Sequence, residues 1–236
     1  MFIKCISQKM NKKISDVLFI IQSRLNSQRV KKKMIRQFSN SNLFEIALKK
    51  VLSSKIIPKE NFYVSVYEEE LKNIALKHSV NIFHRSEESA NNDNSLKKIY
   101  EWHDKLNFKY VIKINPCSPL LRIETIENFT EVFLKQDEEN LFGVIKLNDY
   151  FWDESKKLTT PWPKDQTIMN TKAVEATYKA AHVLYASRLD IIKQNKFMGD
   201  FQKENGIKLF EMNELECFDI DYEWQFKTAE LLYKNL

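Results

Sequence analysis

The sequence predicts an α/β protein with a Rossmann-like, three-layer fold and a mostly parallel sheet. Three observations predict this fold class. Apolar runs of strand length alternate with segments of helical period, the first run is apolar almost throughout, and no linker-like segment divides the chain. An unbroken apolar strand is typical of a sheet that helices cover on both faces. Strands that alternate with helices favour parallel pairing through right-handed crossovers.

The expected elements follow one another along the chain. The patterns predict strands at 17–22, 62–66, 80–83, 110–114 and 142–147. They predict helices beginning near Leu43 and over 68–78, 95–106 and 123–135, and then regular structure at 181–185 with helices at 187–194 and 223–234. We therefore expect one domain over residues 14–236, preceded by an N-terminal extension at 1–13.

Residues 148–180 interrupt this alternation. The segment carries Trp152, Trp162 and the prolines at 161 and 163, and it is too long for a plain loop in a compact domain. We interpret it as an excursion or a dimerisation element, and the second interpretation predicts a homodimer.

Composition excludes several classes of protein. Of the 236 residues, 43% are hydrophobic, which excludes a disordered chain, and no run approaches the length of a membrane span. Three widely spaced cysteines indicate neither a disulfide framework nor a zinc cluster, so we expect a cytoplasmic protein without a membrane partner. The net charge of +5 comes from 37 basic residues interspersed with 32 acidic ones, which favours a solvated surface over nucleic-acid binding. With only three glycines, glycine-rich phosphate loops are excluded.

A basic loop follows the first strand. Between Arg24 and Lys33 the chain brings five cationic side chains into ten residues. Ligands of open α/β sheets bind at the carboxyl ends of the strands, and arginine and lysine are suited to phosphate oxygens. The charge pattern alone leaves open a polyphosphate site or a solvated basic turn.

The spacing within the loop resembles a known signature. Arg24, Ser27, Arg29 and Lys33 fall on the pattern A-R-x-x-S-x-R-x-x-x-K, which is similar to that of the acylneuraminate cytidylyltransferases, the CMP-sugar synthetases related to Kdo and spore-coat-type transferases. The resemblance implies a nucleotide-diphospho-sugar transferase type of fold whose loop wraps the phosphates of CTP. It implies catalytic roles for Arg24 and Lys33 in stabilising charge at the α-phosphorus, and a nucleotide-binding set of Arg24, Asn26, Ser27, Gln28, Arg29 and Lys33.

Two further segments extend this resemblance beyond the loop. Asn115-Pro-Cys-Ser-Pro-Leu-Leu resembles the family's Q-P-T-S-P-L-R segment, which implies sugar binding by Asn115 and Ser118. Arg85 is placed like the arginine of the family's R-P-x-x-L-A segment, which implies contact with the nucleotide or the sugar.

An Asp-x-Asp pair precedes the last predicted helix and is similar to the family's D-I-D ending. Carboxylates at i and i+2 of an extended backbone point to the same side, so Asp219 and Asp221 can share one hard cation such as Mg²⁺. The alternative is that one of them caps the helix.

The resemblance implies transfer of a cytidylyl group from CTP to a sialic-acid-like or other nonulosonic acid, giving a CMP-sugar and pyrophosphate for surface glycan biosynthesis. The chain departs from the family pattern at Gln28, Met34 and Cys117, and Ala180-Ala181 replaces the usual Asn-Gly. These departures leave two alternatives: a member that binds nucleotide or sugar without turnover, and a nucleotidyltransferase that uses another base or sugar.

Overall fold

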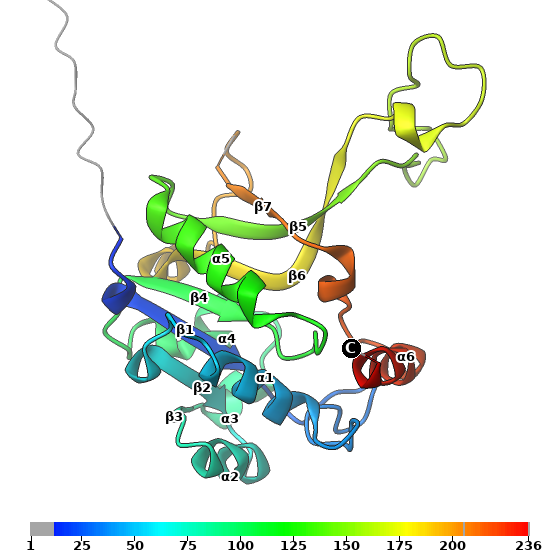
Figure 1. Ribbon diagram of the computed structural model, residues 1–236. Helices are drawn as coiled ribbons and strands as arrows, with labels where there is room; N and C mark the ends of the chain where they lie inside the picture. The colour runs from blue at the N-terminus through cyan, green and yellow to red at the C-terminus, as the bar shows by residue number, and fades with distance from the viewer. Residues whose placement is uncertain (1–11, 205, 236) are drawn as a thin grey trace, which may run out of the picture.

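A seven-stranded sheet in the order β3-β2-β1-β4-β6-β5-β7 runs through the centre of the molecule (Figure 1). The computed structural model describes residues 12–204 and 206–235. The strands are β1 (Val17–Gln22), β2 (Phe62–Val66), β3 (Asn81–His84), β4 (Tyr110–Ile114), β5 (Leu141–Leu147), β6 (Thr177–Arg188) and β7 (Leu209–Glu211). Strand β6 runs antiparallel to β4 and β5, whereas the other pairings are parallel. The predicted α/β class with a mostly parallel sheet is confirmed.

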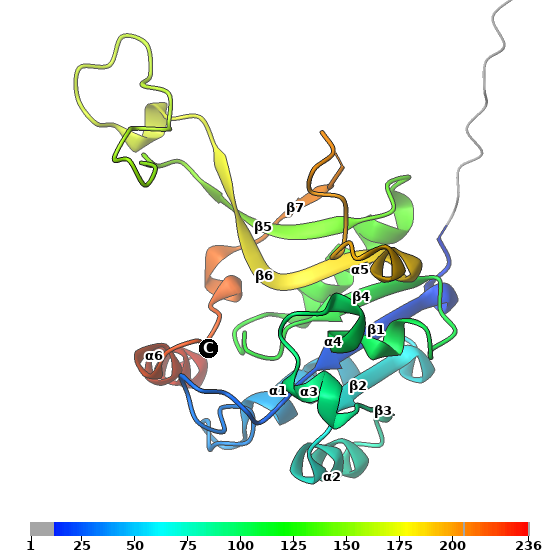
Figure 2. The same cartoon turned by 180° about the vertical axis from the view of Figure 1, so that it is seen from behind.

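Helices lie on both faces of the sheet, as the two opposite views show (Figures 1 and 2). The α-helices are α1 (Leu43–Leu52), α2 (Glu69–Lys77), α3 (Glu87–Asn91), α4 (Leu96–Ile99), α5 (Ile123–Lys135) and α6 (Glu223–Lys234). Short 3-10 helices are η1 (Ile14–Asp16), η2 (Lys59–Asn61), η3 (Glu101–His103), η4 (Thr171–Ala173), η5 (Leu189–Gln194) and η6 (Glu214–Cys217).

Two apolar cores explain why β1 is apolar throughout. Val17, Phe19 and Ile21 point to the first face and pack with side chains of α1, α2, α5 and α6. Leu18 and Ile20 point to the second face, where α4, η3 and η5 supply the covering side chains. Because successive residues of a strand alternate between faces, both sets of side chains must be apolar for the strand to be buried on both faces.

The structure differs from the predicted helices in two places. The helix predicted over 95–106 is split into α4 and η3 at Tyr100. Both Tyr100 and Trp102 are buried in the second core, and one continuous helix would turn them to nearly opposite sides. The prediction of a helix over 187–194 is also wrong. Strand β6 continues to Arg188 in register with β4, and only the 3-10 helix η5 follows it.

The segment predicted as an excursion projects from the body of the protein as an arm (Figures 1 and 2). Strands β5 and β6 run beyond the rest of the sheet and carry it at their ends, pairing as far as Leu147 and Thr177. The arm, residues 148–176, contains η4 and one isolated bridge between Trp152 and Leu158. The predicted extension at 1–13 lies mostly outside the described residues. None of the helices in 12–204 and 206–235 has the length and apolar character needed to cross a membrane.

Candidate active site

A cleft of about 610 Å³ lies where β1 and β4 end, at the carboxyl edge of the parallel strands. The loop after β1, the turn after β4 and the segment before α6 contribute its walls. Most of the residues predicted from the sequence line this one cleft: Arg24, Asn26, Ser27, Gln28, Arg29, Lys33, Asn115 and Asp221.

A larger hollow of about 830 Å³ lies near the start of β4, around Asp16 and Lys109. Several of its charged groups are already paired with one another. Lys109 contacts Asp16 at 2.9 Å, and Arg188 contacts both Glu139 and Asp190. The smaller cleft is the better candidate for a phosphate ligand, because it lies at the carboxyl ends of the parallel strands and most of the predicted residues line it.

Buried anchors hold the basic loop in place. Val30 and Met34 are almost fully buried in the first core and anchor the loop there. At its start the backbone N–H of Leu25 donates to the Glu68 carboxylate at 2.6 Å, which ties the loop to the residues that follow β2. The loop thus lacks glycine yet presents its side chains in a defined arrangement.

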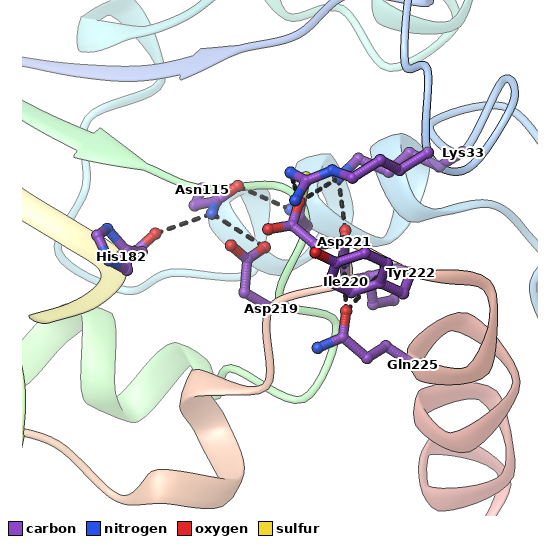
Figure 3. A network of polar contacts seen from close by, with 10 residues as sticks. Lys33, Asn115, His182, Asp219, Ile220, Asp221, Tyr222 and Gln225 are labelled. Carbon is purple, nitrogen blue, oxygen red and sulfur yellow. Dashed lines mark hydrogen bonds and ion pairs between the residues drawn. The ribbon is translucent and has the colours of Figure 1, made fainter. Parts of the chain in front are cut away.

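The cations at the end of the loop meet the Asp-x-Asp segment (Figure 3). The guanidinium of Arg29 lies 2.7 Å from Asp221 Oδ1, and Lys33 Nζ lies 3.5 Å from the same oxygen. Lys33 Nζ also donates to the backbone carbonyl of Ile220 at 2.5 Å. Residues that are distant in the sequence therefore form one charged site.

Asn115 joins the second carboxylate to the sheet (Figure 3). Its amide nitrogen donates to the carbonyl of His182 on β6 at 2.8 Å and to Asp219 Oδ1 at 3.4 Å. Its amide oxygen accepts the backbone N–H of Cys117 at 3.0 Å. Asn115 is therefore a bridge between β4, β6 and the carboxylates, and its side chain is held in one orientation.

His182 has a left-handed backbone with φ of 58°, within β6. This region favours glycine, and another residue there costs on the order of 1 kcal/mol or more. The pairing of β5 with β6 is irregular around this point, since Phe142 pairs with Tyr185 but Val144 pairs with Ala180. The left-handed residue is thus His182, whereas the sequence comparison placed the glycine-containing turn at Ala180-Ala181.

Arg24 lines the cleft, and Arg85 lies next to it in an adjoining space. Arg24 pairs with Asp93 at 3.0 Å and donates to the carbonyl of Ala90 at 3.1 Å. Arg85 is buried, and it donates to the side chain and the carbonyl of Ser89. Burial, and then the charge of Arg24, lower the pKa of Arg85 from its ordinary value. Arg85 therefore borders the cleft behind Arg24 and does not line its main cavity.

Ser118 does not line the cleft. Its side chain is buried and its Oγ has no hydrogen-bond partner among the described residues. Below the turn, the buried Lys50 ammonium donates to the carbonyl of Pro119 at 2.9 Å and contacts that of Ser118 at 3.5 Å. Burial lowers the pKa of Lys50 to about 8. Ser118 thus contributes to a rigid turn, and its predicted contact with a sugar stays a prediction.

The two carboxylates fit a hard cation. Burial, and then the charge of Asp221, raise the pKa of Asp219 above its ordinary value, so a cation between the two would relieve an existing repulsion. The described residues contain no group of three or more His, Cys, Asp or Glu side chains that could hold a metal. An ion here would complete its coordination with water and substrate oxygens, which is the usual arrangement for Mg²⁺.

The sequence model of the cytidylyltransferase family matches residues 18–236, which include all of these site residues. The chain belongs to the cytidylyltransferase family. The resemblance seen in the basic loop is thereby confirmed, and the protein is assigned to a family of enzymes. The cytidylyltransferase loop, turn and Asp-x-Asp segment lie in one cleft, as the carboxyl-end rule predicts.

Individual relatives of this cytidylyltransferase are distant. It is 26% identical to the post-translational flagellin modification protein B of Campylobacter coli, over 94% of this chain and 97% of that protein. It is also 26% identical to the CMP-N,N'-diacetyllegionaminic acid synthase of Campylobacter jejuni subsp. jejuni serotype O:2, over 94% and 98% of the two chains. A CMP:2-keto-3-deoxy-manno-octonic acid synthetase complexed with CTP shares the fold, with a TM-score of 0.66 at 12% identity over 94% of this chain and all of that one.

Sequence reasoning missed three side chains next to the cleft: Lys113, His182 and Tyr185. Lys113 had a visible signal, because it is the one charged residue in the apolar strand Tyr110–Ile114. The sequence around His182 and Tyr185 contains no such signal. Their side chains meet through a contact of 3.1 Å between His182 Nδ1 and the Tyr185 hydroxyl, which depends on the irregular backbone of β6.

Proposed function

We propose that this cytidylyltransferase transfers the cytidylyl group of CTP to a hydroxyl of a sugar acid, giving a CMP-sugar and pyrophosphate. The observation that carries the proposal is the meeting of Arg29 and Lys33 with Asp221 in a single cleft. Family membership supports the use of CTP, and the synthase from C. jejuni, named for a CMP-linked nonulosonic acid, supports an acid as acceptor.

The cations of the loop would bind the triphosphate. In the structure Asp221 contacts Arg29 and Lys33, so its carboxylate stands where phosphate oxygens would make the same charge-assisted bonds. Arg24 and Lys33 would stabilise the charge that develops at the α-phosphorus as the acceptor oxygen attacks and the pyrophosphate oxygen leaves. Asn26, Ser27 and Gln28 line the same wall and would orient the phosphates.

Asp219 and Asp221 would hold Mg²⁺, which would supply Lewis-acid polarisation of the phosphate oxygens. Asn115 would fix the position of Asp219 through its amide. Since Asn115 also contacts β6, it places the carboxylates next to the region where an acceptor would lie. Arg85 would support the nucleotide side of the site by holding Ser89, next to Ala90, whose carbonyl accepts from Arg24.

The arm supports a homodimer as the working form. It exposes large apolar side chains far from the body of the protein, among them Trp152, Trp162, Ile168 and Met169. Exposed apolar groups gathered on a projecting element mark a contact surface. A second copy of the chain would cover them.

Pyrophosphate release tests the proposed activity. Purified protein would be mixed with Mg²⁺, each of the four ribonucleoside triphosphates and a panel of acids: N,N'-diacetyllegionaminic acid, N-acetylneuraminic acid and 3-deoxy-manno-octulosonic acid. We expect release with CTP and at least one acid. Silence across all combinations would overturn the enzymatic proposal. Thermal stabilisation by CTP without any release would instead identify a protein that binds nucleotide without turnover.

A further inference from the structure

Lys113 places a positive charge on the second face of the sheet, in the middle of an apolar surface. Lys113 lies two residues after Val111 on β4, so the two side chains point to the same face, and Val111 is buried there in the second core. Its Nζ lies 5.4 Å from the ring centre of Tyr185 and 6.0 Å from that of Tyr100. The side chain is half-buried, and no ion pair or hydrogen bond to its ammonium occurs among the described residues.

A half-buried ammonium without a counter-ion loses part of its hydration, and aromatic faces compensate for that loss only partly. The other cations near the cleft have partners. Arg24 pairs with Asp93, Arg29 and Lys33 contact Asp221, and Arg85 donates to Ser89. Lys113 is therefore the cation whose surroundings are best completed by an anion from outside the chain.

Lys113 lines a chamber of about 210 Å³ that adjoins the main cleft. Gln22, Ser23, Arg24 and Asp93 line both spaces, so a molecule in the cleft can extend a charged group toward Lys113. On its other side, Lys113 contacts the ring of Tyr185, and the Tyr185 hydroxyl contacts the side chain of His182. The carbonyl of His182 accepts a hydrogen bond from Asn115. The ammonium thus lies between Arg24, at the start of the basic loop, and the β6 residues Tyr185 and His182.

We propose that Lys113 binds the carboxylate of the acceptor sugar acid, an inference that rests on the cytidylyl transfer proposed above. Arg29 and Lys33 already face the position assigned to the triphosphate, and the cytosine base carries no charge. The carboxylate is the remaining anion of the two substrates. A charge-assisted bond from Lys113 would select an acid over a neutral sugar and would turn its hydroxyl toward the α-phosphorus.

The experiment compares each acid of the panel with its uncharged methyl ester. Each ligand would be titrated calorimetrically onto protein that is saturated with α,β-methylene-CTP and Mg²⁺, which binds without turnover. We expect wild-type protein to prefer at least one acid over its ester by about 10- to 100-fold, the range expected for a hydrogen bond between charged groups. Lys113→Met keeps the apolar stem of the side chain and should bind acid and ester alike.

The control variant is Lys146→Met, which removes an exposed lysine from β5 outside both spaces. It should keep the wild-type preference. Three results would overturn the inference: a wild type without preference for any acid, a Lys113→Met variant that retains the preference, and a variant that loses affinity for the CTP analogue instead. Pyrophosphate release separates the two proposals. If wild type releases pyrophosphate and Lys113→Met has an unchanged KM for the acid, the role of Lys113 is contradicted while the proposed cytidylyl transfer stands.

Discussion

Lys33 Nζ and Asp221 Oδ1 lie 3.5 Å apart, which joins the end of the loop after β1 to the segment before the last helix. Arg29 contacts the same oxygen at 2.7 Å. The cations of the site are thus held by pairs that a bound triphosphate would have to replace. In the proposed function, nucleotide binding would exchange carboxylate contacts for phosphate contacts without creating cations that lack partners.

Removing the Lys33 charge should slow the chemical step. Lys33→Met is expected to lower kcat for pyrophosphate release by about 100- to 1,000-fold, as loss of a group that stabilises transition-state charge does in other enzymes. Lys31→Met, which removes an exposed lysine of the same loop, should stay close to wild type. Steady-state kinetics with CTP would measure both. A Lys33→Met protein with wild-type kcat would contradict the assignment.

Asp221→Asn should weaken the affinity of the site for a divalent cation. With one charged ligand gone, the Mg²⁺ concentration for half-maximal activity should rise at least about 10-fold. Glu223→Gln provides the matched control, since Glu223 is a nearby carboxylate that pairs with Arg36 at 2.7 Å and does not line the cleft. Equal Mg²⁺ dependence of the two variants would argue against Asp221 as a ligand.

The raised pKa of Asp219 predicts a gain in stability when its charge is removed. Burial and the nearby Asp221 disfavour the charged form in the folded state, so at neutral pH the ionised carboxyl lowers the free energy of unfolding. Without metal, Asp219→Asn should therefore melt at a higher temperature than wild type. As pH falls through the folded-state pKa, wild type should gain stability relative to the variant, until the difference disappears below the ordinary pKa of aspartate.

Thermal melts at pH 3 to 8, in EDTA and with Mg²⁺, would measure this effect. Mg²⁺ should raise the melting temperature of wild type more than that of Asp219→Asn, because the ion relieves the repulsion that the variant lacks. An Asp219→Asn protein that is less stable than wild type at neutral pH without metal would contradict this prediction.

The apolar surface of the arm should control assembly. The doubly substituted variant Ile168→Asp, Met169→Asp places charges on two side chains that are 69% and 58% exposed. We expect wild type to sediment as a dimer and this variant as a monomer, since buried unpaired charges are costly. Leu76→Asp is the control, because Leu76 is 64% exposed on α2, away from the arm. A wild type that is monomeric at micromolar concentration would contradict the proposed dimer.

The sequence predicted the position of the cleft better than its internal contacts. The strand β1 is apolar on both faces and the loop that follows it is charged, so the edge where ligands bind could be located from pattern alone. Asp221 and Lys33 were expected in one site because the family resemblance placed both segments there. Their distance depends on how α6 packs on the first core through Phe226 and Ala229.

The missed features depend on contacts between distant parts of the chain. Tyr100 ends α4 early because tertiary packing outweighs the helical pattern, and the left-handed His182 reflects an irregular pairing of β5 with β6. Ser118 fits the family motif, yet its side chain is buried because the turn is held from below by Lys50. Local sequence patterns carry no information about such partners.

In the proposed scheme, Lys113 on β4 would hold the acid, while the phosphate loop follows β1 and the paired aspartates precede α6. Separate stretches of the chain would thus bind the two substrates. Substitutions along a single strand could change which acid is accepted while the handling of the nucleotide stays intact. Such a division offers a short mutational route by which related enzymes could diversify the sugars that they activate.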